Sequence, residues 1–199
     1  FRKDRACADA IAQCFNLLAK RNSPQWVLEG DIQACFDRIS HDWLLAHVPI
    51  QRAILQKWLK AGYLEKRALY PTEEGTPQGG IISPVLANLA LDGLAAELVG
   101  RFPKHWRRNR GDRVNLVRYA DDFVITGSSR ELLEQEVRPV VERFLSVRGM
   151  TLPPEKPLLT HIEPGSVFPA QNVLKHDANS FIKQPTTNLP PALQLIRGR

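Results

Sequence analysis

At 199 residues, the chain is long enough to form one or two domains with a buried core. Hydrophobic residues make up 43% of it and charged residues 24%, which are globular values and exclude a wholly disordered protein. The net charge of +6 at pH 7 favours an acidic partner, and nucleic acid is the first candidate.

The cysteines and the hydropathy of the chain indicate which cellular compartment to expect. Cys7, Cys14 and Cys35 lack metal-ligand spacing and leave one thiol unpaired in any disulfide scheme. Cys7 and Cys14 lie seven residues apart on one face of an expected helix, so we expect them to be small buried side chains, and the protein to occupy a reducing compartment such as the bacterial cytoplasm. The longest apolar stretch, residues 79–100, contains proline and acidic residues, so no membrane span is predicted. The chain begins with Phe1 rather than methionine, and we expect a fragment or a processed form of a protein.

The first half of the chain alternates helix and strand signals. Residues 4–20 repeat apolar side chains with a helical period, and residues 50–60 do so again. Between them, residues 26–32 are typical of a strand, with Asp31 near its end. A serine N-cap and a first-turn proline predict a further helix over residues 83–98.

The second half is predicted to begin with a hairpin. Residues 114–120 and 122–126 are two β-prone runs that meet at a pair of aspartates, which favours a tight turn. Residues 128–149 predict a helix that opens with a capping box over residues 128–131, ends at a glycine and is kinked at Pro139.

The composition changes near the end of the chain. Eight of the fifteen prolines fall between Pro153 and the C-terminus, where periodicity is weak. We therefore expect an ordered domain over residues 1–163 and an irregular, proline-rich tail over residues 164–199 that is truncated or degenerate.

Three carboxylates form the candidate catalytic cluster. Asp121 and Asp122 are adjacent within an apolar run, where like charges repel and burial disfavours ionisation. If the strand that carries Asp31 lies beside the hairpin, three carboxylates converge, and divalent cations would neutralise them. Mg²⁺ binds such groups together with water and phosphates, and two ions suit nucleotidyl transfer. For the aspartate pair alone, a solvated turn is the competing interpretation.

Two more stretches decide between these interpretations. They are EGDIQACFDRI, residues 29–39, and GTPQGGIISPVLANLALDGL, residues 75–94, which precede VRYADDFVIT, residues 117–126. Over about residues 1–162 the chain thereby resembles the reverse transcriptases, most closely those encoded by group II introns. Because three separate motifs occur in the expected order, each tests the others. The resemblance implies an α+β fold, with an antiparallel palm sheet backed by helices and part of the fingers.

The resemblance also implies roles for residues around the metals. Asp31 and Asp121 would bind two Mg²⁺ ions, with Asp122 assisting and the backbone carbonyl of Ile32 completing one site. Phe36 would lie under the incoming sugar and exclude a 2′-hydroxyl, although core packing is the competing interpretation for a phenylalanine.

Further residues would contact the nucleotide. Gln78 and Gly79 would touch it or the template, since glycine permits close backbone approach. Lys156 would lie near the departing pyrophosphate, with a surface lysine as the competing interpretation. At the N-terminus Arg2, Lys3 and Arg5 would meet template or triphosphate, although Lys3 and the residue after it replace a usual Pro-Gly.

A basic segment, residues 101–113, is a candidate RNA contact. It holds six Lys or Arg residues and one acidic residue, and a charged connection exposed to solvent is the competing interpretation. Arginines beside an aromatic ring suit phosphate contact with base stacking. The residues concerned are Trp106, Arg107, Arg108 and Arg110.

The leading functional prediction is RNA-directed DNA polymerase activity with an RNA template (intron RNA among the candidates), a DNA primer or target, and dNTPs. The alternatives are a maturase-like module that binds intron RNA without copying it, and a CRISPR-associated reverse transcriptase, which shares these motifs. Pro157 stands where the family has a strand residue, and no thumb motif is recognised after it. We therefore expect other segments to be needed for processive synthesis.

Overall fold

The computed structural model describes residues 6–18, 23–30, 32, 34–65, 68–70, 72, 74–76, 80–103, 113–153 and 158–161. Its centre is a four-stranded antiparallel sheet with strand order β4-β5-β1-β6. These strands are β1 (Trp26–Gly30), β4 (Asn115–Tyr119), β5 (Asp122–Gly127) and β6 (Leu158–His161). The antiparallel sheet expected from the sequence is confirmed.

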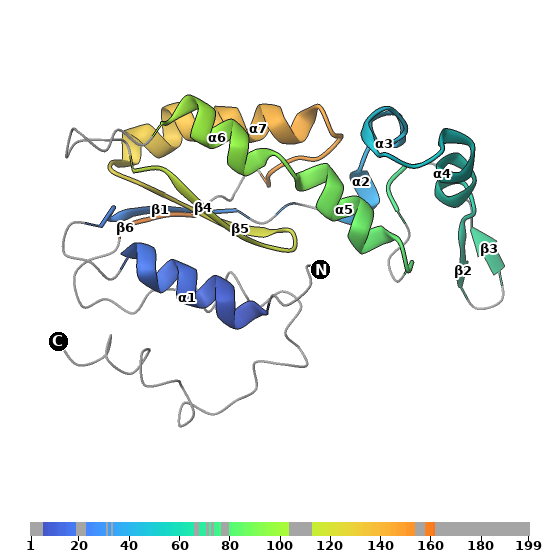
Figure 1. Cartoon of the computed structure of the whole chain (residues 1–199), viewed down its shortest axis with the longest axis horizontal. Helices are drawn as coiled ribbons and strands as arrows, with labels where there is room; N and C mark the ends of the chain where they lie inside the picture. The colour runs from blue at the N-terminus through green and yellow to red at the C-terminus, as the bar shows by residue number, and fades with distance from the viewer. Residues whose placement is uncertain are drawn as a thin grey trace, which may run out of the picture.

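Helices cover both faces of this sheet (Figure 1). On one side lie α5 (Ser83–Leu91), α6 (Leu94–Arg101), the π-helical segment η1 (Leu132–Val137) and α7 (Arg138–Ser146). On the other side lies α1 (Cys7–Leu18), which contacts β4. Alternation along β1 explains the two layers, because Leu28 packs into the larger core and Val27 into the smaller core beneath α1.

The chain between β1 and α5 extends beyond one end of the sheet (Figure 1). It forms α2 (Cys35–Arg38), α3 (His41–His47), α4 (Arg52–Leu59) and a hairpin of β2 (Tyr63–Glu65) and β3 (Ala68–Tyr70). The amphipathic helix expected over residues 50–60 is α4, and the helix expected over residues 4–20 is α1. The short helices α2 and α3 were not predicted.

The single helix expected over residues 83–98 is wrong in its length. The structure breaks it into α5 and α6 at Gly93, which has a φ of 94° and is the N-cap of α6. A positive φ is readily adopted by glycine and costly for other residues, so the sequence does contain the signal for the break. The serine is also not the N-cap, because Ile82 occupies that position and Ser83 is the first helical residue.

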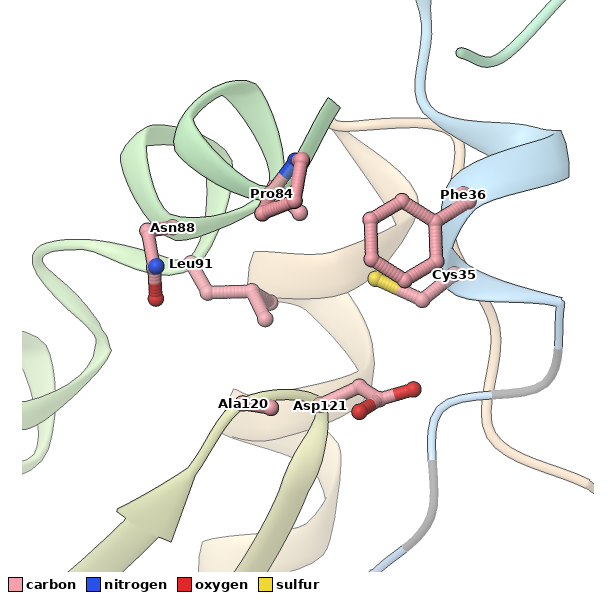
Figure 2. A pocket seen from close by; sticks show the side chains of 8 residues that line it. Cys35, Phe36, Pro84, Asn88, Leu91, Ala120 and Asp121 are labelled. Atoms are coloured by element: carbon pink, nitrogen blue, oxygen red, sulfur yellow. The ribbon is translucent and has the colours of Figure 1, made fainter. Parts of the chain in front are cut away.

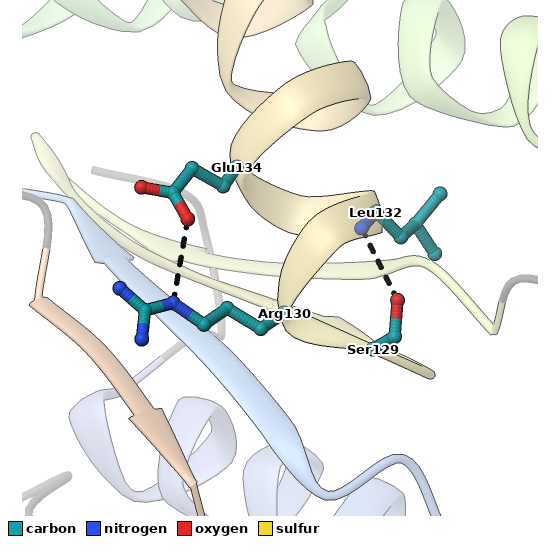
Figure 3. A network of polar contacts seen from close by, with 4 residues as sticks. All are labelled: Ser129, Arg130, Leu132 and Glu134. Atoms are coloured by element: carbon teal, nitrogen blue, oxygen red, sulfur yellow. Dashed lines mark hydrogen bonds and ion pairs between the residues drawn. The ribbon is translucent and has the colours of Figure 1, made fainter.

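The helix expected over residues 128–149 also differs at its start. The side chain of Ser129, not Ser128, accepts a hydrogen bond from the backbone N–H of Leu132 at 3.2 Å, while Arg130 pairs with Glu134 at 3.3 Å (Figure 3). The proline is accommodated by a change from π-helical to α-helical bonding, since η1 ends where α7 begins.

The end of α7 follows the sequence-based expectation. Gly149 has a φ of 81°, and the N–H of Met150 reaches back to the carbonyl of Leu145 at 3.0 Å. Cys14 is buried, as predicted, and Cys35 is also buried, with its Sγ 3.7 Å from Sδ of Met150. Among the helices of the described ranges, none combines the length and apolar character needed to cross a membrane.

Candidate active site

The aspartate pair lies at the tight hairpin that the sequence predicts. Tyr119 of β4 pairs with Asp122 of β5, which leaves Ala120 and Asp121 as the two turn residues. Ala120 has a φ of 54°, an unfavourable region for alanine. Asp122 is 9% exposed at the first position of β5, whereas Asp121 is half-buried. The two neighbouring carboxylates therefore occupy different environments.

A pocket joins this turn to two helices (Figure 2). Its walls come from α2, from one face of α5 and from the hairpin turn, so all three sequence motifs contribute to it. The lining residues are Cys35, Phe36, Pro84, Ala87, Asn88, Leu91, Ala120 and Asp121. The structure thus places Phe36 and Asp121 at the lining of one pocket, and their roles in catalysis stay a prediction.

Phe36 is held at the pocket by its short helix. Ala34 enters α2 with a φ of 48°, Cys35 is buried in the core, and the Phe36 ring packs partly against that core while it lines the pocket. Ile32, just before α2, is only 2% exposed. The Phe36 ring therefore contacts the core and also borders the pocket, and its role toward a sugar stays a prediction.

The backbone of Gly75 and Thr76, which precedes the sequence Pro-Gln-Gly-Gly, is hydrogen-bonded to α2 and its C-cap. The N–H of Thr76 donates to the carbonyl of Phe36 at 2.6 Å, and the N–H of Gly75 donates to the carbonyl of Ile39 at 3.1 Å. Nε2 of His41 lies 2.6 Å from the carbonyl oxygen of Gly75 and must carry the proton, because a carbonyl only accepts. Thr76 thus lies directly beside Phe36.

Many predicted site residues lie outside the described ranges. Asp31 is one of them, although Gly30 before it pairs with Phe123, the neighbour of Asp122. Within the described part of the chain, no three His, Cys, Asp or Glu residues form a group that could hold a metal. The other predicted residues outside the described ranges are Arg2, Lys3, Arg5, Gln78, Gly79, Trp106, Arg107, Arg108, Arg110 and Lys156.

Sequence reasoning missed two polar residues at the site. Nη1 of Arg118 donates to Oδ1 of Asn88 at 3.2 Å and to the carbonyl of Ala120 at 2.7 Å. Both residues had a recognisable signal: Asn88 interrupts an apolar helix, and Arg118 occupies a position on β4 that faces Phe123 across the ladder. Polar residues at inward-facing positions require partners, and here the partners are at the pocket.

Glu29 is an additional acidic group close to the site, on the α1 face of the sheet. Burial raises the pKa of its carboxyl, and Oε1 has no hydrogen-bond partner among the described residues. Burial, with a smaller contribution from the negative charge of Glu29, also raises the pKa of the Cys14 thiol to about 11. Cys14 is therefore a thiol at neutral pH and has no nucleophilic character there.

Residues 1–185 match the family model described as "Reverse transcriptase (RNA-dependent DNA polymerase)". The chain belongs to the reverse transcriptase family. Among its relatives is the group II intron-encoded protein LtrA of Lactococcus lactis subsp. cremoris, which is 39% identical over 46% of this chain and 16% of its own length. Protein YkfC of Escherichia coli K12 is 29% identical over 76% of this chain and 47% of its own length. This reverse transcriptase chain therefore spans less than half of either relative.

Solved structures confirm the fold of this reverse transcriptase domain. Telomerase from Candida tropicalis, in complex with a TWJ fragment of telomeric RNA, aligns with a TM-score of 0.55 and 16% identity over 80% of this chain and 29% of the telomerase chain. Telomerase from Candida albicans aligns with a TM-score of 0.53 over 79% of this chain and 30% of its own. At such low sequence identity, these structural alignments support the predicted α+β palm fold and nothing more specific.

Proposed function

We propose that this chain is the catalytic palm of an RNA-directed DNA polymerase of the group II intron type, which adds dNTPs to a primer 3′-OH on an RNA template. The observation that carries the proposal is the pocket, in which Phe36, the first turns of α5 and Asp121 meet. Residues 1–163 would form the catalytic unit, and further segments of a longer protein would complete it.

The proposed metal ligands are carboxylates at one end of the neighbouring strands β5 and β1. Asp121 and Asp122 supply oxygen donors at the hairpin, and the register of Gly30 with Phe123 brings the strand that precedes Asp31 alongside them. Oxygen donors of this kind suit Mg²⁺. When bound there with the carbonyl of Ile32, two Mg²⁺ ions would stabilise the attacking and leaving oxygens of the transfer.

The remaining roles concern nucleotide and nucleic acid. The Phe36 ring would obstruct a ribose 2′-hydroxyl, while Gln78 and Gly79 would contact the nucleotide and Lys156 the departing pyrophosphate. Two basic groups of residues would hold phosphates or stacked bases. They are Arg2, Lys3 and Arg5 near the N-terminus, and Trp106, Arg107, Arg108 and Arg110 after α6.

The decisive experiment is primer extension on an RNA template with Mg²⁺. Asp31→Asn and Asp121→Asn should each abolish extension while RNA binding persists, because each removes a ligand charge and keeps the side-chain shape. The control is Asp42→Asn on α3, an exposed carboxylate. Near-normal extension by either site variant would contradict the two-metal proposal.

A second candidate function is maturase-like binding of intron RNA without synthesis. It is favoured by the intron association in the names of several relatives, including the protein in the cob intron of Schizosaccharomyces pombe, which is 27% identical over 90% of this chain. In that case the wild-type chain would bind RNA and fail to extend a primer, and Asp121→Asn would change neither result.

A further inference from the structure

Arg118 connects the aspartate turn to α5. One guanidinium nitrogen, Nη1, donates to the carbonyl of Ala120 at 2.7 Å and to Oδ1 of Asn88 at 3.2 Å. A guanidinium Nη group has two hydrogens, so this nitrogen uses both of them. Arg118 is half-buried and does not line the pocket, whereas both of the residues it binds do.

The bond to Ala120 falls where the backbone is strained. A φ of 54° costs a non-glycine residue about 1–2 kcal/mol, and such a conformation persists only where its surroundings enforce it. The carbonyl of Ala120 belongs to the peptide that continues into Asp121. A hydrogen bond that fixes this carbonyl therefore also fixes the orientation of the backbone at Asp121.

The bond to Asn88 fixes a side-chain amide at the pocket. Because Arg118 can only donate, Asn88 must present its oxygen to it, which leaves the amide hydrogens as the remaining polar groups of that side chain. Asn88 lies on the same face of α5 as Pro84 and Leu91, which also line the pocket. Through Asn88, the hairpin turn and α5 are held in one relative position.

We propose that Arg118 is a positioning residue for nucleotidyl transfer: its double hydrogen bond holds the strained turn that carries Asp121 at a fixed place against Asn88 of α5. This inference rests on the proposed polymerase function. Displacement of a reacting group by about 1 Å can cost on the order of 100-fold in rate, so a loosened turn would affect the chemical step more than nucleotide binding.

The test compares Arg118→Gln, Arg118→Lys and Asn88→Ala with the wild-type chain in single-nucleotide extension. Arg118→Gln should lower kcat by about 10-fold to 100-fold, with the KM for dNTP changed less than about threefold. Asn88→Ala should lower kcat less, since the bond to Ala120 remains. Arg118→Lys keeps a charged donor and should restore part of the lost rate.

Two controls separate positioning from general damage. Arg130→Gln removes an arginine whose described partner, Glu134, lies one turn along the same exposed helix surface, and it should leave kcat unchanged (Figure 3). The double variant of Arg118→Gln with Asn88→Ala should be no slower than Arg118→Gln alone, because the bridge is already absent. If Arg118→Gln does not fold, Asn88→Ala becomes the deciding variant. A wild-type kcat for Asn88→Ala would then overturn the proposal that Arg118 holds the turn against Asn88.

Hydrogen exchange gives a readout that does not need activity. In Arg118→Gln, amides of the β4–β5 turn should exchange faster, while those of α7 should keep their wild-type rates. If the wild-type chain does not extend a primer, the polymerase proposal fails, but exchange still tests whether Arg118 holds the turn. Wild-type kcat together with unchanged turn exchange in Arg118→Gln would overturn the inference.

Discussion

Glu29 is an acidic residue at a position where the sheet requires an apolar one. It follows Val27 on the face beneath α1, opposite Val124, and its Oε1 has no described partner. Burial raises the pKa of this carboxyl above its ordinary value of 4.5. The folded state therefore favours the protonated form, which a low-polarity environment accommodates at less cost than a carboxylate.

This shift predicts a pH dependence of stability. Because the folded pKa is raised, the contribution of Glu29 to stability is fully present below about pH 4.5 and is lost as the pH rises through the folded value. Glu29→Gln removes the ionisable group, so it should remove that loss and raise the free energy of unfolding at neutral pH relative to the wild type.

Urea unfolding of both proteins between pH 4 and pH 8 measures this effect. The exposed Glu134, which pairs with Arg130 on the helix surface, gives the matched control Glu134→Gln, and this change should leave the pH profile as it is. If the stability of Glu29→Gln falls with pH as steeply as that of the wild type, another group titrates instead.

At the scale of elements, the close packing of Gly75 on α2 fixes the position of the backbone that precedes residues 77–80. Gly75 has a φ of 71°, and a Cβ at this position would overlap the backbone of Phe36 and Asp37. Alanine there meets both an unfavourable φ and a clash with immobile atoms. The loop could then keep its hydrogen bonds to α2 only if α2 itself moved.

Gly75→Ala is therefore predicted to cost about 2 kcal/mol of stability or more, and to reduce primer extension by displacing the backbone that leads to Gln78. Gly100→Ala is the matched control, since Gly100 lies in α6 and its added Cβ would meet no described atom within 4 Å beyond its chain neighbours and its own helix backbone. That substitution should raise stability by about 0.5–1 kcal/mol. If the close packing of Gly75 on α2 is the cause, Gly75→Ala should lower the unfolding temperature and the extension rate, whereas Gly100→Ala should raise the unfolding temperature. Thermal unfolding and primer extension of the two variants measure these effects.

The elements also explain which features the sequence could predict. Strands β1, β4 and β5 have strong β-prone patterns and a short turn, so their positions and the hairpin were predicted from local signals. The break at Gly93 was missed, because a glycine inside an apolar helical pattern is read as tolerated unless its φ is known. Four-residue α2 carries too little periodicity to be recognised at all.

At the scale of the whole molecule, the site depends on contacts between residues that are far apart in the sequence. No local sequence pattern contains these contacts. The motifs predict that Phe36 and Asp121 belong to one site, and in the structure both residues line the same pocket. The bridge from Arg118 to Asn88 joins two elements through side chains whose meeting depends on how α5 packs on the sheet. Residue types alone could indicate that each needs a partner, but only the packing identifies that partner.

The positive charge of the whole chain leads to the last prediction, which uses salt as a probe of RNA binding. The net charge is +6, and the basic segment after α6 holds Arg107, Arg108 and Arg110 beside Trp106. If these arginines contact phosphates, changing all three to Gln should weaken binding to unrelated RNAs equally. The slope of log affinity against log salt should become less steep by about 0.7 per contact on single strands, or about 2 in total.

Trp106→Ala separates base stacking from phosphate contact in the same measurement. Loss of one stacked base should cost about 1–3 kcal/mol of binding free energy and leave the salt slope unchanged, because no counterion is involved. The control is Arg138→Gln on α7, which removes a positive charge that pairs with Glu142 at 2.7 Å. If the triple variant keeps the wild-type slope, these three arginines do not contact phosphates, and the remaining candidates for the phosphate contacts are Arg2, Lys3 and Arg5.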